Sequence, residues 1–357
     1  MRPSPAIVLA HHYYCSDNGK TAHGLVRGSE RFRVYAVVDP DCAGHDAGEL
    51  LDGVHRGIPV VASTSAALAI APEPPRHALV GVATHGGYFT PKLRAYLLEA
   101  IQHGLGIVNG LHEYAADDPE LAAAAQEQVV ELIDLRRPKP KSELRFWSGA
   151  ITTLTIPRIA VLGTDCAVGK RTTTRLLTQA LNAIGIKTEM IYTGQTGWLQ
   201  GGQYGFVLDS VVNDYVSGEL EQALLTCAQQ VAPDLMLIEG QSALRNPSGP
   251  CGAELLISGG ARGVILQHAP ARQFFDGCEH LGYRIPPLAD EIRLIAMYGS
   301  RVLAVTLNGQ GLSAEALAAE RERLEIELGI PVIRPLTDGV ERLIPVVRDF
   351  IRSEHKP

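Results

Sequence analysis

A glycine-rich stretch at Gly163–Thr172 contains the residue types that bind phosphate groups. In loops of this kind, backbone N–H groups and a helix N-terminus surround the phosphate oxygens, and a lysine, here Lys170, reaches the outer phosphates as a point charge. We therefore predict a P-loop. Its phosphate-binding residues are Gly163, Thr164, Asp165, Cys166, Ala167, Val168, Gly169, Lys170, Arg171 and Thr172.

The spacing within this loop departs from the usual pattern, in which four residues separate the first glycine from Gly-Lys and a Ser or Thr follows directly. Here five residues separate Gly163 from Gly169, and Arg171 stands at the position of the hydroxyl that binds Mg²⁺. The alternative is a chance glycine turn, which the strand before it and the helix after it disfavour. If Mg²⁺ is used, the predicted ligands are Asp165, Thr172 and Glu239.

A second acidic position follows the apolar run Leu235–Ile238, which we predict to be a strand. Glu239-Gly240-Gln241 comes directly after that run. Polar side chains at the carboxyl ends of parallel strands line the crevice in which ligands bind. Glu239 could therefore hold Mg²⁺ or act as a general base, and Gln241 could contact a substrate. The alternative for Glu239 is an acid that faces solvent at a strand end.

The strand predicted at Lys187–Tyr192 is followed by Thr193-Gly194-Gln195-Thr196-Gly197. Its two glycines would allow a ligand to approach the backbone closely, although an ordinary turn is the alternative. Two aspartates further on could bind a substrate amine or a metal, or equally cap the helix that begins near Tyr215. The predicted substrate-binding residues are Gln195, Thr196, Gly197, Asp209, Asp214 and Gln241.

Two more predicted strands end in polar residues. His268 follows Gly263–Gln267 and is a candidate catalytic base beside Glu239 and Lys170, with a structural histidine as the alternative. Asn308 follows Val302–Val305, and a side-chain amide pairs naturally with an adenine edge. We therefore add Asn308 to the predicted nucleotide-binding residues.

These residues require a scaffold of parallel strands joined by helices. Short apolar runs alternate with helical patterns such as Lys92–His103 and Thr172–Ala183 throughout the chain, and this alternation indicates βαβ units. We predict an α/β protein in which each domain has a mostly parallel sheet flanked by helices. The predicted strands are Ala6–Ala10, Val34–Val38, Pro59–Ala62, Ala78–Val82, Gly106–Val108, Ile159–Leu162, Lys187–Tyr192, Leu235–Ile238, Gly263–Gln267, Val302–Val305 and Pro331–Ile333.

The length of 357 residues exceeds that of one average domain. The Pro/Lys stretch at 138–141 is the expected boundary, because proline stops a helix and charge keeps a segment in water. We therefore predict a Rossmann-like α/β domain at 1–140 and a P-loop nucleotide-binding α/β domain at 141–357. The chain is expected to end in a helix over Gly339–Ser353.

Charge and composition narrow the range of partners. A net charge of −7 argues against nucleic acid and anionic membranes as partners, and no stretch is apolar enough to span a membrane. Six cysteines occur without a Cys-x-x-Cys pair, so we expect reduced thiols and a cytoplasmic location. The expected partner is a small amino-acid substrate, and α/β enzymes of this kind are usually homo-oligomers.

The first domain offers a weaker signal for a ligand. The strand predicted at Val34–Val38 ends in Asp39, the position at which dinucleotide-binding folds carry an acid. The glycine fingerprint that must follow the first strand is missing, because His11-His12-Tyr13-Tyr14-Cys15 occupies that position. NAD binding is therefore not supported.

Taken together, these motifs resemble a two-domain P-loop family long described as a domain of unknown function and associated with D-glutamate N-acetyltransferase. The resemblance covers nearly the whole chain. One departure is Arg245-Asn246-Pro247, where a His before the Pro is expected. The motifs that carry it are Lys20-Thr-Ala-His-Gly-Leu25, Gly86-Gly87, Asn109-Gly-Leu-His112, Asp134-Leu-Arg136, Gly163–Thr172, Gly194-Gln-Thr-Gly197, Glu239-Gly-Gln241 and Gln267-His268.

The resemblance implies a Rossmann-like domain, a P-loop domain related to dethiobiotin synthetase, and acetyl transfer from acetyl-CoA to an amino-acid nitrogen. The residues themselves suggest ATP with Mg²⁺ and phosphoryl transfer. Three hypotheses follow: an amino-acid N-acetyltransferase, an ATP-dependent ligase or kinase acting on a small carboxylate, and a non-catalytic nucleotide-binding regulator. The phosphate bound by the P-loop belongs to coenzyme A in the first and to ATP in the second.

Overall fold

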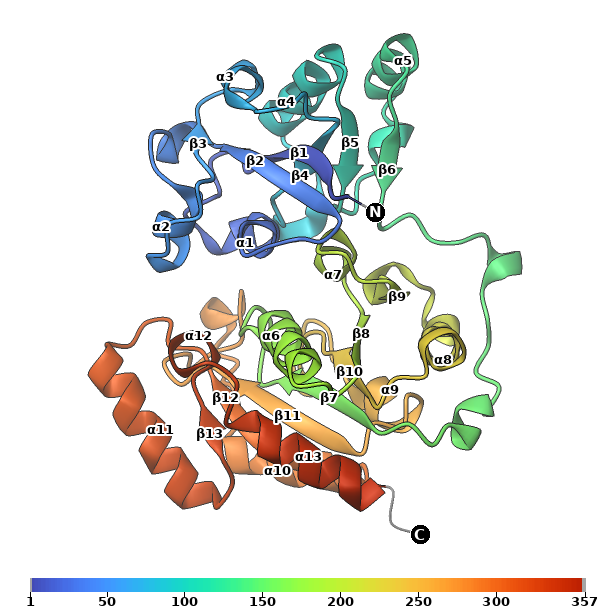
Figure 1. The fold of residues 1–357 in the computed structure, drawn as a ribbon, viewed down its shortest axis with the longest axis vertical. Coiled ribbons are helices and arrows are strands. Elements are labelled where there is room, and N and C mark those ends of the chain that lie inside the picture. Colours follow the sequence, from blue (N-terminus) through green and yellow to red (C-terminus); the bar gives the residue numbers. More distant parts are fainter. Residues whose placement is uncertain (1, 355–357) are drawn as a thin grey trace. The chain divides into compact units, whose positions relative to one another are not determined.

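The computed structural model describes residues 2–354 and divides the chain into two compact units. Unit 1 comprises Met1–Lys139 together with Gln195–Gly202, and unit 2 comprises Pro140–Gly194 together with Gln203–Pro357. Figure 1 shows both units as sheets flanked by helices. The segment Gln195–Gly202 differs from the sequence-based division, which placed every residue after 140 in the second domain.

Unit 1 is built on a six-stranded parallel sheet with the strand order β3-β2-β1-β4-β5-β6. Its strands are β1 (Ser4–Leu9), β2 (Phe32–Val38), β3 (Val60–Val61), β4 (His77–Val80), β5 (Gly106–Asn109) and β6 (Leu132–Asp134). Its helices are α1 (Lys20–Val26), α2 (Ala47–Asp52), α3 (Thr64–Ile70), α4 (Pro91–Gln102), α5 (Pro119–Gln128) and α7 (Gln195–Leu199).

Strand β1 shows why the sequence is apolar without interruption there. Ile7 and Leu9 enter one hydrophobic cluster, whereas Ala6 and Val8 enter another. Successive side chains of a strand point to opposite faces, so a strand covered by helices on both faces is apolar at every position. The short apolar runs therefore correspond to buried parallel strands, as predicted.

The segment Gln195–Gly202 is held in unit 1 by hydrogen bonds from several elements. Ser29 Oγ donates to the carbonyl of Leu199 at 2.7 Å, and Gln200 Nε2 donates to the carbonyl of Gly24 at 2.7 Å. The Arg31 guanidinium lies 4.0 Å from the centre of the Trp198 ring and donates to the Trp198 carbonyl. Helix α7 is thus part of the core of unit 1, where Leu199 is fully buried.

Unit 2 is built on a seven-stranded parallel sheet with the order β13-β12-β11-β7-β10-β8-β9. The strands are β7 (Arg158–Gly163), β8 (Thr188–Tyr192), β9 (Tyr204–Gly205), β10 (Leu235–Glu239), β11 (Gly263–His268), β12 (Arg301–Leu307) and β13 (Val332–Ile333). The helices are α6 (Lys170–Ala183), α8 (Asn213–Val231), α9 (Ala253–Ile257), α10 (Leu288–Met297), α11 (Ala314–Leu328), α12 (Pro335–Asp338) and α13 (Leu343–Glu354).

Strand β7 lies at the centre of this sheet, between β10 and β11. Its alternate residues again enter two clusters, Ala160 and Leu162 on one face and Ile159 and Val161 on the other. The predicted fold class, two α/β domains with parallel sheets flanked by helices, is confirmed. The short edge strands β6 and β9, of three and two residues, were not predicted.

The last helix, α13, begins at Leu343 and not at Gly339 as predicted. The four-residue helix α12 ends at Asp338, and Gly339 has a φ of 76°, which interrupts the helical backbone. Within residues 2–354, no helix combines the length and the apolar character needed to cross a membrane.

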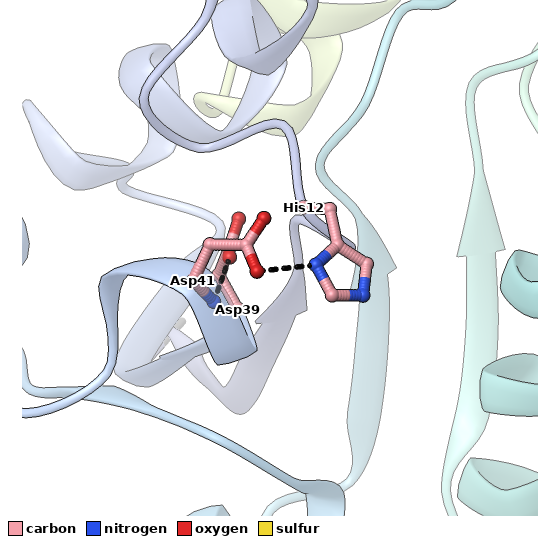
Figure 2. A group of neighbouring side chains, drawn as sticks. All are labelled: His12, Asp39 and Asp41. Carbon is pink, nitrogen blue, oxygen red and sulfur yellow. Dashed lines mark hydrogen bonds and ion pairs between the residues drawn. The ribbon is translucent and has the colours of Figure 1, made fainter.

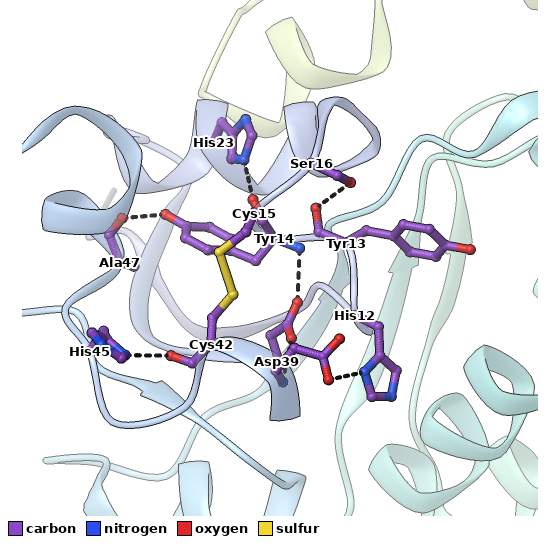
Figure 3. The surroundings of a disulfide bond; sticks show 11 residues. His12, Tyr13, Tyr14, Cys15, Ser16, His23, Asp39, Cys42, His45 and Ala47 are labelled. Carbon is purple, nitrogen blue, oxygen red and sulfur yellow. Dashed lines mark hydrogen bonds and ion pairs between the residues drawn. A yellow bond between two sulfur atoms is a disulfide. The ribbon is translucent and has the colours of Figure 1, made fainter.

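Cys15 and Cys42 form a disulfide, which corrects the expectation that all six cysteines are reduced (Figure 3). Strands β1 and β2 are neighbours that pair Leu9 with Val38, so the loops after them carry both cysteines to the same edge of the sheet. The two cysteines are 27 positions apart in the sequence, which gives no spacing signal. The cysteines that remain free are Cys166, Cys227, Cys251 and Cys278.

Candidate phosphate-binding site

The P-loop connects the central strand β7 to helix α6, as predicted. Gly169 precedes the helix with a φ of 110°, and no side chain caps the helix N-terminus. A Cβ atom on Gly163 would lie 2.9 Å from both Lys170 Cδ and Val168 Cγ2, so glycine allows the loop to fold tightly over the lysine. A 14-residue helix therefore points the positive end of its dipole at the carboxyl edge of the sheet, where it can bind an anion.

Lys170 is buried beneath this loop, with 7% of its surface exposed. Its Nζ donates to the carbonyl of Asp165 at 2.6 Å and to the carbonyl of Ser242 at 2.8 Å. A lysine ammonium has three N–H donors, so one remains for a phosphate oxygen. Burial lowers the pKa of Lys170, opposed by the neighbouring Cys166 and Asp165. A bound phosphate would compensate this burial of positive charge.

Asp165 is fully buried and accepts three hydrogen bonds. Its Oδ1 accepts from Asn246 Nδ2 at 2.9 Å, and its Oδ2 accepts from Arg272 at 2.9 Å and from the backbone N–H of Asp276 at 2.8 Å. Arg272 also donates to the carbonyl of Cys166 at 2.7 Å. These contacts give Asp165 a role in holding the loop's shape, and its Mg²⁺-binding role stays a prediction.

Glu239 ends strand β10 and pairs in register with Val161 of β7. Only 3% of Glu239 is exposed, so the alternative of a solvent-facing acid is wrong. Its Oε2 accepts the backbone N–H of Thr193 at 3.0 Å, and the Thr193 hydroxyl donates to the Glu239 carbonyl at 2.8 Å. Burial raises the pKa of Glu239, while Arg171 and the Thr193 N–H act in the opposite direction. A raised pKa makes this carboxylate a stronger base than an exposed glutamate.

Two glycines allow Glu239 and the P-loop to come close together. A Cβ atom on Gly240 would lie 2.3 Å from the Val161 carbonyl and 3.1 Å from Lys170 Cδ. A Cβ atom on Gly194 would lie 2.8 Å from Gln241 Nε2. Gln241 Nε2 also donates to the Thr193 hydroxyl at 3.0 Å, so Gln241 and Glu239 fix the same threonine.

His268, at the end of β11, lies against the start of the P-loop. Its Nδ1 is 2.9 Å from Thr164 Oγ1. Burial lowers the pKa of His268 to about 4, so the imidazole is neutral at pH 7. Asn308 Nδ2 donates to the Val168 carbonyl at 3.2 Å, which gives Asn308 a contact with the loop. Its pairing with adenine stays a prediction.

Gln267 and Ser242, which were not among the predicted site residues, also support the loop. Gln267 Oε1 accepts from the hydroxyls of Thr173 and Thr306 at 2.6 Å each, which joins helix α6 to strands β11 and β12. Ala167 and Ser242 have φ values of 53° and 36°, which are unusual for residues other than glycine. Backbone of this kind is concentrated at ligand sites. The position of Ser242, just after the Glu-Gly-Gln run, was the available signal.

The roles of the other predicted substrate residues stay predictions. Gln195, Thr196 and Gly197 are buried in α7 of unit 1. There a Cβ atom on Gly110 would come within 2.8 Å of Gln195 Cγ. Asp209 is exposed in the short helix Leu208–Ser210. Asp214 is exposed in the first turn of α8, where an acid interacts favourably with the helix dipole.

Arg245, the departure noted in the sequence, donates to Glu291 Oε2 at 2.7 Å. Glu291 is buried, and burial raises the pKa of Glu291 against the opposing effect of Arg245. The arginine therefore has an ion-pair partner on helix α10 of the same unit.

The fold and the loop define a P-loop α/β protein with a second, Rossmann-like unit. Residues 145–344 match the family described as "Domain of unknown function (DUF1611_C) P-loop domain", and residues 40–138 match "Domain of unknown function (DUF1611_N) Rossmann-like domain". The chain belongs to the DUF1611 family. The resemblance stated from the sequence motifs is confirmed.

Two relatives of this chain carry the same functional name. The chain is 30% identical over 279 residues to a D-glutamate N-acetyltransferase from Tritonibacter scottomollicae, and 30% identical over 272 residues to a protein of the same name from Pseudoalteromonas sp. Each match covers 74% of this chain and 79% of the relative. A crystal structure of a DUF1611 family protein from Anabaena variabilis is 30% identical, with a TM-score of 0.87 over 98% of this chain and 99% of that one.

Proposed function

We propose that this protein transfers an acetyl group from acetyl-CoA to the amino nitrogen of a small amino acid such as D-glutamate. The observation that carries the proposal is the N-terminus of α6, whose N-cap Gly169 makes no side-chain cap hydrogen bond and whose first residue is the buried Lys170. The names of the two relatives, which match three quarters of the chain, supply the reaction. Coenzyme A is an adenine nucleotide, and its phosphates would bind at this loop.

Arg171 supports coenzyme A as the ligand. It occupies the position at which a P-loop that uses Mg²⁺ carries a hydroxyl. A guanidinium is always charged and pairs with phosphate through two parallel hydrogen bonds. With Lys170, it gives the loop two positive charges for the phosphates without a metal ion.

Glu239 is the proposed general base. In acetyl transfer the neutral amine nitrogen attacks the thioester carbonyl, the C–S bond breaks, the amine loses a proton and coenzyme A leaves as a thiol. Because burial raises the pKa of Glu239, its carboxylate is a stronger base than an exposed glutamate and can take that proton. His268, whose pKa is about 4, is a weaker base, and we assign it to positioning Thr164.

A second candidate is an ATP-dependent ligase or kinase that activates a small carboxylate. The observation in its favour is the register of Glu239 beside β7, which places an acid on the strand next to the P-loop strand. Oxygen ligands at that position suit Mg²⁺, with Thr172 and Asp165 as the further predicted ligands. When bound, Mg²⁺ would neutralise charge on the transferred phosphoryl group.

The two reactions release different products, so one experiment separates them. The purified protein is incubated with D-glutamate and either acetyl-CoA or ATP–Mg²⁺, and free thiol, N-acetylglutamate, ADP and phosphate are measured. Thiol and N-acetyl product formed without ATP support the proposal. ADP and phosphate formed only when the amino acid is present, without consumption of acetyl-CoA, would overturn it.

Variants test the assigned roles. Glu239→Gln is expected to lower kcat by about 10²–10⁴-fold and to leave binding of acetyl-CoA nearly unchanged, because a general base acts in the chemical step. Lys170→Met is expected to weaken acetyl-CoA binding. The matched controls are Glu279→Gln and Lys141→Met, which change exposed side chains of the same unit. Equal losses in kcat and binding for Glu239→Gln would make Glu239 a positioning residue.

A further inference from the structure

Three side chains that can bind metal ions meet at the carboxyl edge of the sheet in unit 1, outside the P-loop unit. They belong to His12, Asp39 and Asp41, and one ligand atom from each lies within 4.8 Å of the other two (Figure 2). His12 Nδ1 is 2.8 Å from Asp41 Oδ1. The proposed acetyl transfer uses none of these residues.

The register of two neighbouring strands brings the cluster together. Leu9 at the end of β1 pairs with Val38 at the end of β2. Asp39 follows β2 directly, Asp41 lies in the short helix Pro40–Cys42, and His12 follows β1 after a left-handed turn in which its own φ is 63°. The Cys15–Cys42 disulfide joins the same two loops, so their separation is covalently limited (Figure 3).

Asp39 is a buried carboxylate with an unusual set of partners. It is fully buried and accepts the backbone N–H groups of Tyr14 at 2.8 Å and Asp41 at 3.0 Å. No lysine or arginine within residues 2–354 forms a hydrogen bond or an ion pair with Asp39. Buried carboxylates are usually paired with a cation or bound to a metal.

His11, next to His12 in the chain, has a buried side chain close to the cluster. Only 4% of its surface is exposed, and its Nδ1 has no hydrogen-bond partner among the described residues. Its Nε2 lies 3.2 Å from Thr90 Oγ1, and its ring centre lies 5.3 Å from that of His12. An unpartnered buried imidazole nitrogen is rare, because burial of such a group without a partner costs free energy.

We propose that His12 Nδ1 and the carboxylates of Asp39 and Asp41 bind one divalent transition-metal ion, such as Mn²⁺ or Zn²⁺. An imidazole with two carboxylates is a mixed donor set that favours these ions over Mg²⁺ and Ca²⁺. The His12 and Asp41 side chains are 33% and 62% exposed, so an ion can enter from solvent. Three protein ligands leave a coordination position open for water or a small carboxylate ligand.

The test measures metal binding by the full-length protein after treatment with a chelator and in the absence of nucleotide. Mn²⁺ is titrated with detection of the free ion by electron paramagnetic resonance, because Mn²⁺ prefers nitrogen and oxygen ligands to the free thiols of unit 2. Zn²⁺ is titrated by calorimetry in parallel. We expect one equivalent of Mn²⁺ to bind, and Mg²⁺ and Ca²⁺ to compete poorly.

Variants locate the ion. His12→Gln and Asp41→Asn are expected to weaken Mn²⁺ binding at least about tenfold. The matched control is His103→Gln, since His103 is an exposed histidine of the same unit whose Nε2 lies 3.3 Å from the Ser65 hydroxyl. Far-UV circular dichroism checks that each variant is folded. We expect both variants to fold, because the His12 and Asp41 side chains are partly exposed.

Two results would overturn this proposal. One is an absence of Mn²⁺ and Zn²⁺ binding to the wild-type protein at millimolar ion concentrations. The other is equal Mn²⁺ affinity of the wild-type protein and the folded His12→Gln and Asp41→Asn variants. Because the measurement needs neither acetyl-CoA nor ATP, its outcome is independent of the proposed acetyl transfer.

Discussion

The side-chain amide of Asn246 donates a hydrogen bond of 2.9 Å to Asp165 Oδ1. Asn246 lies in the segment after β10, so this contact joins the strand that carries Glu239 to the P-loop. Arg272, from the segment after β11, binds the other oxygen of the same carboxylate at 2.9 Å. One buried aspartate therefore holds together three segments at the edge of the sheet.

Asp165→Asn is expected to lower the free energy of unfolding of unit 2 by about 3 kcal/mol, because Arg272 loses the charge it pairs with in a buried setting. Urea unfolding measures the change. The control is Asp290→Asn, which breaks the more exposed pair with Arg293 and should cost less than about 1 kcal/mol. An equal loss in both variants would contradict the role assigned to Asp165.

Gly240→Ala is expected to disrupt phosphate binding. The new methyl group would lie 2.3 Å from the Val161 carbonyl and 3.1 Å from Lys170 Cδ, and the central strand cannot move without affecting its neighbours. Calorimetry with acetyl-CoA and with ATP should show a large loss of affinity. Gly249→Ala, where an added Cβ meets nothing within 4 Å, is the control and should bind as the wild type does.

His268 gives the protein a specific pH dependence. Its folded-state pKa of about 4 lies below the ordinary value of 6.5, so protonation favours the unfolded chain. The stability associated with neutral His268 is complete above pH 6.5 and is lost as the pH falls towards 4. The loss reaches about 3 kcal/mol, since one pKa unit corresponds to about 1.4 kcal/mol.

Urea unfolding between pH 4 and pH 8 checks this expectation. His268→Asn removes the titrating group. The unfolding free energy of the wild type minus that of the variant should therefore decrease as the pH is lowered through this range. His280→Asn, which changes an exposed histidine of the same unit, is the control. A difference for His268→Asn that stays constant with pH would show that His268 does not titrate in this way.

Leu199→Ala tests the position of α7. Leu199 is fully buried in the core of unit 1, so its truncation is expected to cost about 2–5 kcal/mol there. Hydrogen exchange should show faster exchange in β1 and β4, while β7 and β10 stay protected. Ile326→Ala, at a side chain 85% exposed, should change little. Loss of protection confined to β7 and β10 would refute the assignment of α7 to unit 1.

Much of the scaffold could be predicted because parallel strands buried on both faces are apolar at every position. Ile159–Leu162 and Ala6–Ala10 are examples, and each lies within one or two residues of an observed strand. The P-loop was recognisable because glycines, a lysine and a following helix are local in sequence. Such local patterns are kept in the folded protein, because the backbone conformation of the loop is set by the glycines and by the helix that follows them.

The rest depended on contacts between distant residues. The sequence does not show that Asn246 and Arg272 bind Asp165, because these residues lie 81 and 107 positions away from it. The sequence does not show that Gln195 and Thr196 belong to unit 1, because their burial there depends on tertiary packing. The cluster of His12 with Asp39 and Asp41 was hidden for the same reason, since only the pairing of β1 with β2 brings them together.

The route of the chain through α7 has a consequence for anyone who wishes to separate the two units. A gene fragment that ends at residue 139 encodes a unit 1 without Leu199 and Gln200, and the complementary fragment carries these two residues without the surface that buries them. We therefore expect that a cut in the Pro/Lys linker leaves neither half able to fold independently. Shuffling of the units between homologues would require three crossover points, at 139, 194 and 202, and the two units are expected to be inherited as one.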